Sequence, residues 1–99
     1  MTVNEIKNEG EIRLEISGRV DTNTAPQLQQ AILVAFQKEK NLILDFKDVK
    51  YISSAGLRAL LIGEKTAKSK GGKMVITGAN DVVMNVFKVT GFINILTLE

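Results

Sequence analysis

The sequence predicts a single α/β domain over residues 1–99, with a mixed β-sheet that opens with an antiparallel hairpin and with helices packed on one face. Apolar residues alternate near the N-terminus, as in a half-buried strand, and recur at intervals of three and four further along, as in amphipathic helices. Strands and helices then alternate, which is typical of α/β domains with right-handed crossovers. A chain of 99 residues can bury one core but not two.

The first two elements are expected to form the hairpin. Ile12, Leu14 and Ile16 alternate with polar residues, and a weaker strand is expected over residues 2–7. Asn8-Glu9-Gly10 between them has the composition of a tight turn. The two strands are therefore predicted to be antiparallel.

The first helix is predicted to follow a loop over residues 18–24 that is rich in capping side chains. Pro26 falls in the first helical turn, where its missing N–H costs little. One face of the segment is apolar at helical spacing and is expected to face the core. These residues are Leu28, Ala31, Ile32, Ala35 and Phe36.

Three further strands and two further helices complete the expected order. Residues 42–46 are mostly apolar and predict a strand covered on both faces, followed by a connection over 47–51. Two further strands are expected at 74–76 and 93–98.

Helix ends are predicted from capping residues. The second helix is expected to begin at Ser53-Ser54 and to end at Gly71-Gly72, after a turn rich in lysine that complements the helix dipole. The third is expected to begin at Asn80 or Asp81 and to end at Gly91.

The composition argues against several classes of partner. The formal charge is only +2 and aromatic residues make up 5%, so nucleic-acid binding is not expected. The chain has no cysteine, hence no disulfide or thiolate metal site. No apolar run reaches the ~18 residues that span a bilayer, and the N-terminus lacks a signal-peptide pattern, so the prediction is a cytoplasmic protein without membrane insertion.

No enzymatic chemistry is expected, and no catalytic residue, metal site or cofactor is predicted. Histidine is absent, and a Ser-x-x-Lys dyad would need lysine where Gly56 and Leu57 stand. The phosphate-binding motif GxxxxGK[ST] is absent as well. Asp45, expected in a strand, and Asp48, expected in a loop, lack a second set of ligands and are interpreted as solvated or turn-forming.

Two loops are predicted to meet at one end of the sheet. The loop before the first helix and the loop before the second both leave the carboxyl ends of parallel strands, where sites form in open α/β sheets. Asp21 and the Ser53-Ser54 pair should therefore lie close together.

The two serines admit two interpretations. Serine is a favoured helix N-cap, worth about 1 kcal/mol, and one of the pair is expected to serve that purpose. A hydroxyl at a helix N-terminus is also a favourable seat for a phosphate, because unpaired N–H groups and the positive end of the dipole face it. Gly56 has no side chain to block an approaching partner, and Arg58 either reaches back to a phosphate or is simply solvated.

Four segments together resemble a known family. The stretch from Asp45 to Leu57, DFKDVKYISSAGL, resembles the signature of STAS domains, specifically the bacterial anti-sigma-factor antagonists. The segments at 18–21 (GRVD), 70–72 (KGG) and 86–92 (VFKVTGF) resemble further family motifs, so that the likeness extends over the whole chain.

The resemblance implies a phosphorylated serine. In the family, a partner that is both serine kinase and anti-sigma factor phosphorylates the serine that falls on Ser54, and a PP2C-type phosphatase reverses the modification. The unphosphorylated form binds the anti-sigma factor. The family's preceding aspartate is replaced here by Ser53, which becomes a competing acceptor, and Asp21 is the expected remaining acidic contact.

The leading hypothesis is a non-enzymatic switch protein, which binds its anti-sigma factor when unphosphorylated and is released when Ser54 is phosphorylated. One alternative is a constitutive STAS adaptor in a transporter or signalling assembly, and another is a nucleotide-binding module near Asp21 and Ser54. The residues expected to contact the partner lie in the two loops and the first turn of the second helix. They are Asp21, Thr22, Thr24, Ser53, Gly56, Leu57 and Arg58.

Overall fold

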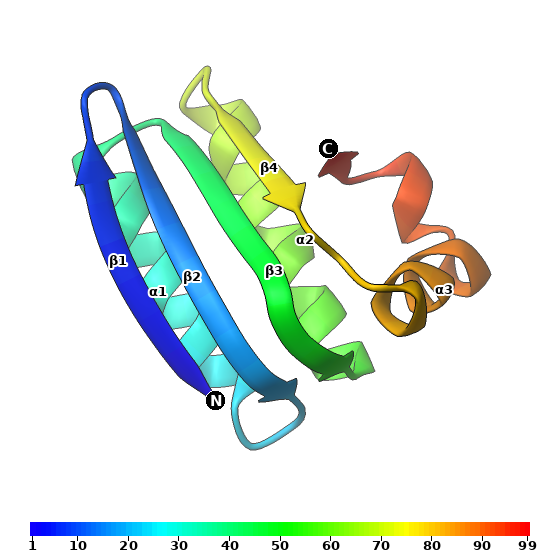
Figure 1. Ribbon diagram of the computed structural model, residues 1–99. Helices are drawn as coiled ribbons and strands as arrows, with labels where there is room; N and C mark the ends of the chain where they lie inside the picture. The colour runs from blue at the N-terminus through cyan, green and yellow to red at the C-terminus, as the bar shows by residue number, and fades with distance from the viewer.

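The computed structural model describes residues 1–99 and has a five-stranded mixed sheet in the order β1-β2-β3-β4-β5. The first pair is antiparallel and the other neighbours are parallel, as the sequence predicted (Figure 1). The strands are β1 (Thr2–Asn8), β2 (Glu11–Val20), β3 (Asn41–Ile52), β4 (Lys73–Thr77) and β5 (Thr97–Leu98).

Two long helices cover one face of the sheet. α1 (Ala25–Lys38) and α2 (Ser54–Ser69) lie side by side behind the strands, which confirms the predicted packing for this pair (Figure 1). α3 (Asp81–Thr90) lies past the end of β4, beside the second half of β3, and a short 3₁₀ helix, η1 (Phe92–Asn94), follows it. No helix in the structure has the length and apolar character needed to cross a membrane.

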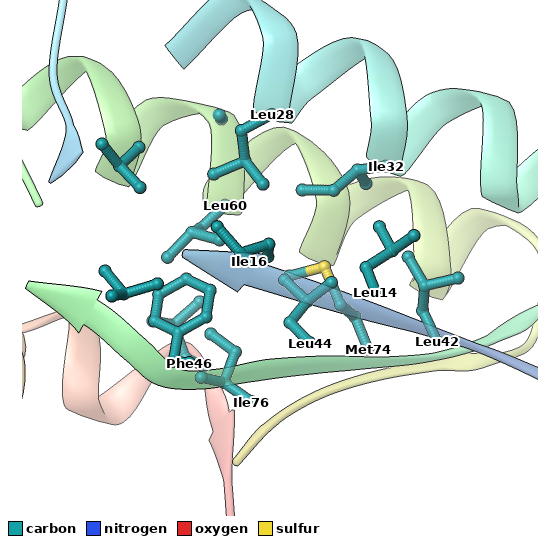
Figure 2. Packing of buried hydrophobic residues seen from close by; sticks show 14 of the residues in the cluster. Leu14, Ile16, Leu28, Ile32, Leu42, Leu44, Phe46, Leu60, Met74 and Ile76 are labelled. Atoms are coloured by element: carbon teal, nitrogen blue, oxygen red, sulfur yellow. The ribbon is translucent and has the colours of Figure 1, made fainter. Parts of the chain in front are cut away.

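The core lies between the sheet and these helices. Alternate side chains of β2 and β3, such as Leu14 and Leu44, are fully buried against Ile32 of α1 and Leu60 of α2 (Figure 2). The predicted apolar stripe of α1 is confirmed, since its central residues are buried or packed against the core. This packing holds the starts of both helices against the ends of β2 and β3.

Both central strands are longer than the sequence predicted. β3 continues through residues 47–51, which were expected to be a connection, and β2 continues to Val20. The reason is pairing, because Ser17–Val20 of β2 pairs with Asp48–Ile52 of β3, with two register shifts at which β3 has an extra residue. The partner strand satisfies the backbone hydrogen bonds, although most side chains of residues 47–51 are polar and several are exposed.

The C-terminal segment also differs from the prediction. Instead of one strand over 93–98, the chain forms η1 and then the two-residue strand β5. Gly91 ends α3 as expected, with φ 79°, and Asn80 rather than Asp81 is its N-cap, since Asn80 accepts a hydrogen bond from the Val83 N–H at 2.9 Å.

Candidate functional site

The carboxyl ends of β2 and β3 meet, and the two loops predicted to be neighbours are held together by the backbone. The Ser53 N–H donates a hydrogen bond to the Val20 carbonyl at 2.8 Å, directly after the paired residues Val20 and Ile52. The start of α2 therefore lies against the loop that carries Asp21.

Ser53 is the N-cap of α2. Its backbone is extended (φ −93°, ψ 175°), and its Oγ accepts a hydrogen bond from the Gly56 N–H at 3.4 Å. Its carbonyl accepts the first intrahelical bond, from the Leu57 N–H at 2.9 Å. One of the two serines was expected to cap the helix, and it is Ser53.

Ser54 is the first residue of α2 and is exposed. Its hydroxyl takes no part in capping and is free to meet another molecule. The first N–H groups of a helix have no intrahelical acceptor, and the helix dipole adds positive potential there. Both effects favour negative charge on this turn, so the setting of Ser54 suits a phosphate group.

Gly56 and Leu57 are buried and do not form part of the surface, so the expectation that they contact a partner needs correction. A Cβ on Gly56 would lie 2.6 Å from Ile52 Cγ1 and 2.8 Å from Val20 Cγ1. The missing side chain therefore leaves room for the ends of β2 and β3 rather than for a partner. Leu57 is 5% exposed and belongs to the core cluster.

Asp21 and Thr24 fix the shape of the loop before α1. The Asp21 Oδ1 accepts hydrogen bonds from the N–H groups of Asn23 (3.0 Å) and Thr24 (3.1 Å). The Thr24 hydroxyl accepts from the Asp21 N–H at 2.8 Å and donates to the Arg19 carbonyl at 2.9 Å. Thr24 therefore stabilises the loop instead of capping α1 with its side chain.

The carboxylate of Asp21 is held in its charged form. Partial removal of water from the carboxyl group raises the pKa of Asp21, but hydrogen bonds from the backbone of Thr24 and Asn23 more than offset this, with a further contribution from the Arg19 charge. The pKa of Asp21 consequently lies below its usual value. Asp21 therefore places a negative charge at neutral pH in the loop next to the start of α2.

A shallow hollow of about 360 Å³ lies between the first turns of α1 and α2. Arg58 and Ala55 contribute from α2, so the hollow opens next to Ser54. Arg58 is exposed and is engaged in none of the ion pairs of the structure, which leaves its guanidinium group available for an anion. The lining residues are Thr22, Ala25, Pro26, Gln29, Gln30, Ala55 and Arg58.

Sequence reasoning missed two features of this surface. The Arg19 guanidinium carbon lies 4.5 Å from the centre of the Tyr51 ring, a cation–π contact between β2 and β3. Aligning RVD with YIS as parallel strand ends would have revealed it, because Arg19 and Tyr51 are paired in the sheet. Gln29 and Gln30, on the walls of the hollow, carried no sequence signal at all.

The chemistry that the arrangement offers is that of a surface hydroxyl. Serine needs a hydrogen-bonded base to become a nucleophile, and no side chain of the chain accepts a hydrogen bond from Ser54. What the site offers is an exposed hydroxyl on a helix N-terminus, beside a hollow that Arg58 and Thr22 help to line.

This chain is similar to known proteins over most of its length. The family model for the Mlab, STAS domain matches residues 4–97. The anti-sigma-B factor antagonist of Bacillus subtilis (strain 168) is 27% identical over 93 residues, which cover 94% of this chain and 85% of that protein.

Two solved structures share the fold. An anti-sigma factor antagonist from Mycobacterium paratuberculosis superposes with a TM-score of 0.85 at 24% identity, covering 98% of this chain and 83% of the other. The Bacillus cell fate determinant SpoIIAA in its phosphorylated form superposes with a TM-score of 0.76 at 14% identity, covering 99% and 91%. Since the family model matches nearly the entire chain, this protein belongs to the STAS-domain family.

Proposed function

We propose that this chain is an anti-sigma factor antagonist, a non-enzymatic binding protein whose association with an anti-sigma factor is controlled by phosphorylation of Ser54. The observation that carries the proposal is that the two serines differ in structural role. Ser53 caps α2, and Ser54 exposes its hydroxyl on the first turn. The similarity to the antagonist of Bacillus subtilis supports the class of partner.

The unphosphorylated chain would bind its partner through the exposed part of this surface. Ser54, Arg58 and Thr22 are exposed, and Asp21 and Thr24 are partly exposed beside them. Gly56 and Leu57 contribute indirectly, by holding the start of α2 against the sheet. The partner would be an anti-sigma factor with serine kinase activity, encountered in the cytoplasm.

Phosphorylation would change this surface without unfolding it. A phosphoryl group adds about −1.5 to −2 charges, and the start of α2 can hold it through backbone N–H groups and the helix dipole. Arg58 lies one helical turn from Ser54, on the same side of the helix, and is positioned to pair with it. A docked partner would have to strip water from the remaining charge of the phosphate, which costs several kcal/mol when the partner itself offers no matching group.

Ser54 is a better acceptor than Ser53. A kinase acting on Ser53 would have to take its half-buried oxygen away from the Gly56 N–H and so uncap the helix. Ser54 can be modified with the cap intact. A PP2C-type phosphatase would then restore the binding form by removing an exposed phosphate.

The test combines phosphorylation with binding. The purified chain is incubated with ATP and a kinase-like anti-sigma factor from the same organism, and phosphopeptides are mapped by mass spectrometry. We expect phosphate on Ser54, loss of uptake in Ser54→Ala, and normal uptake in the matched variant Ser53→Ala. In calorimetric titration without ATP, Ser54→Ala should bind the anti-sigma factor and Ser54→Asp should bind about a hundredfold more weakly.

Two results would overturn the proposal in different ways. Phosphate on Ser53 alone would move the switch to the capping residue. Equal binding by Ser54→Ala and Ser54→Asp, with no phosphate uptake, would instead favour a constitutive STAS adaptor, in which the hydroxyls of both serines serve only the start of α2.

A further inference from the structure

Strand β1 presents an unpaired edge along its whole length. It is the outermost strand of the sheet, and no other element lies beside it (Figure 1). Its seven residues pair with β2 in an unbroken register and contain no proline, so neither a bulge nor a missing N–H disrupts the free edge. Such an edge is a template for another strand. The opposite edge of the sheet is the two-residue strand β5.

The side chains of β1 are complementary to a second copy of β1 in one register. Backbone groups that point away from the sheet alternate along an antiparallel strand, so symmetric registers can differ only in steps of two. Centring the pair on Ile6 places Glu5 opposite Lys7 of the second copy, and Lys7 opposite its Glu5. Centring it on Glu5 or on Lys7 places like charges face to face, which is destabilising.

The charges on this edge extend onto α1. Glu5 pairs with Lys38 at 2.8 Å, and Lys7 lies 3.9 Å from Glu39. In the register centred on Ile6, Glu5 would also face Lys7 of the second copy, and Lys7 would also face its Glu5. The result would be two symmetric rows of alternating charge across the joined strands, a more favourable arrangement than isolated surface pairs.

Apolar surface lies on both faces of the same edge. Ile6, on the face away from the helices, is 36% exposed and would contact its equivalent across the symmetry axis. On the helix face, a groove of about 390 Å³ opens between β1 and α1. Val3, Ala31 and Val34 are among its apolar lining residues. A strand added beside β1 would cover part of this surface.

We infer that two copies of this chain associate through antiparallel pairing of their β1 strands, with Ile6 at the twofold axis, into one continuous sheet. The inference does not rest on the proposed function, because β2 separates β1 from β3 and hence from the start of α2. The association would leave Ser54 accessible on each copy.

The test uses two variants with one reversed charge each. Two copies of the same variant should repel each other along β1, whereas one copy of each variant should attract. Sedimentation velocity over a wide concentration range should show a monomer–dimer equilibrium for the unaltered chain. Glu5→Lys alone and Lys7→Glu alone should each weaken dimerisation about tenfold or more, since both cross-strand pairs then carry like charges. An equimolar mixture of the two variants should associate again, because every cross-strand pair in the mixed dimer joins opposite charges.

The mixture separates pairing between copies from effects within one chain. If the substitutions acted only by breaking the ion pairs with Lys38 and Glu39, mixing would restore nothing. Circular dichroism of each variant serves as the control that it is folded. An unaltered chain that stays monomeric at all concentrations, a dimer indifferent to both reversals, or a mixture no more associated than its components would each overturn the inference.

Discussion

The hydroxyl oxygen of Ser53 accepts a hydrogen bond from the Gly56 N–H at 3.4 Å, and the two residues together determine how α2 begins. Ser53 satisfies one of the unpaired N–H groups of the first turn, and Gly56 lets that turn lie directly on the ends of β2 and β3. The exposed position of Ser54 follows from both contacts. Each has consequences that can be measured without the binding partner.

Removing the Ser53 hydroxyl should destabilise the fold modestly. We expect Ser53→Ala to lower the free energy of unfolding by about 0.5–1 kcal/mol, the lower part of the usual range for a lost N-cap, because the bond is long. Ser53→Asp should retain the stability, since aspartate is an equally good cap. Urea denaturation followed by circular dichroism measures both. Ser54→Ala is the matched control and should leave the midpoint unchanged, whereas equal losses at the two serines would contradict the assigned cap.

Adding a methyl group at Gly56 should be costly despite the better helix propensity of alanine. The new Cβ would lie 2.6 Å from Ile52 Cγ1, and overpacking of this kind costs about 1–3 kcal/mol, against a gain of about 1 kcal/mol from propensity. Gly63→Ala offers a comparison in the same helix. Its nearest contact is the flexible Met74 sulfur at 2.6 Å, so its loss should be smaller. A Gly56→Ala variant as stable as the unaltered chain would show that the start of α2 is not tightly packed.

Ionisation of Glu64 should make the fold less stable at neutral pH than at acidic pH. The side chain is buried on the inner side of α2, and its Oε2 has no hydrogen-bond partner. Burial raises the pKa of Glu64 above its usual value of 4.5, and the nearby charge of Lys68 offsets this only partly. The protonated form is therefore favoured by folding. Its contribution to stability is complete below the unfolded pKa and is lost as the pH rises through the folded pKa.

Glu64→Gln keeps the size of the side chain and removes its ionisation. We expect a higher melting temperature than that of the unaltered chain at pH 7, and a difference that shrinks as the pH falls through the raised folded pKa and is gone below about 4.5. Glu9→Gln, in the exposed hairpin turn, controls for the loss of one negative charge. If the melting temperatures of the variant and the unaltered chain differed by the same amount at every pH, ionisation of Glu64 would not affect stability.

Asp45 should contribute stability of the opposite pH dependence. The sequence interpretation of Asp45 as solvated is wrong, because its side chain is 4% exposed and accepts a hydrogen bond from Arg13 Nη2 at 2.9 Å. Burial alone would raise the pKa of Asp45. The hydrogen bond from the Lys47 N–H at 3.0 Å and the Arg13 guanidinium have the larger, opposite effect, so that the pKa of Asp45 lies below its usual value. The contribution is present above the unfolded pKa and is lost as the pH falls through the folded pKa.

The corresponding variant is Asp45→Asn, which we expect to cost about 1.5–3 kcal/mol at pH 7, the usual value of hydrogen bonds to charged groups. Asp48→Asn, three residues further along β3 and exposed, should change the unfolding midpoint little. Denaturation at several pH values measures both variants. The prediction fails if the two substitutions have equal effects or if the loss at Asp45 persists unchanged in acid.

Local patterns in the sequence were sufficient for the order and type of the main elements. The alternation around Leu14 and the stripe around Ile32 are short-range signals, and both correspond to buried faces in the structure. Gly91 and the pair Gly71-Gly72 marked helix ends because they adopt, or lie beside, backbone angles that other residues avoid. The closeness of Asp21 and Ser53 was predictable as well, since parallel strands joined by helices place their ends together.

The remaining features depend on residues far apart in the chain. Residues 47–51 became strand because β2 lies beside them, and Asp45 is buried because Arg13 of that same strand pairs with it. Which of the two serines caps α2, and why Gly56 has no side chain, was decided by the fit of the helix start against Val20 and Ile52. Periodicity reports which side of an element is apolar, but the distances that assign a role to a polar side chain or a glycine exist only once the elements have packed.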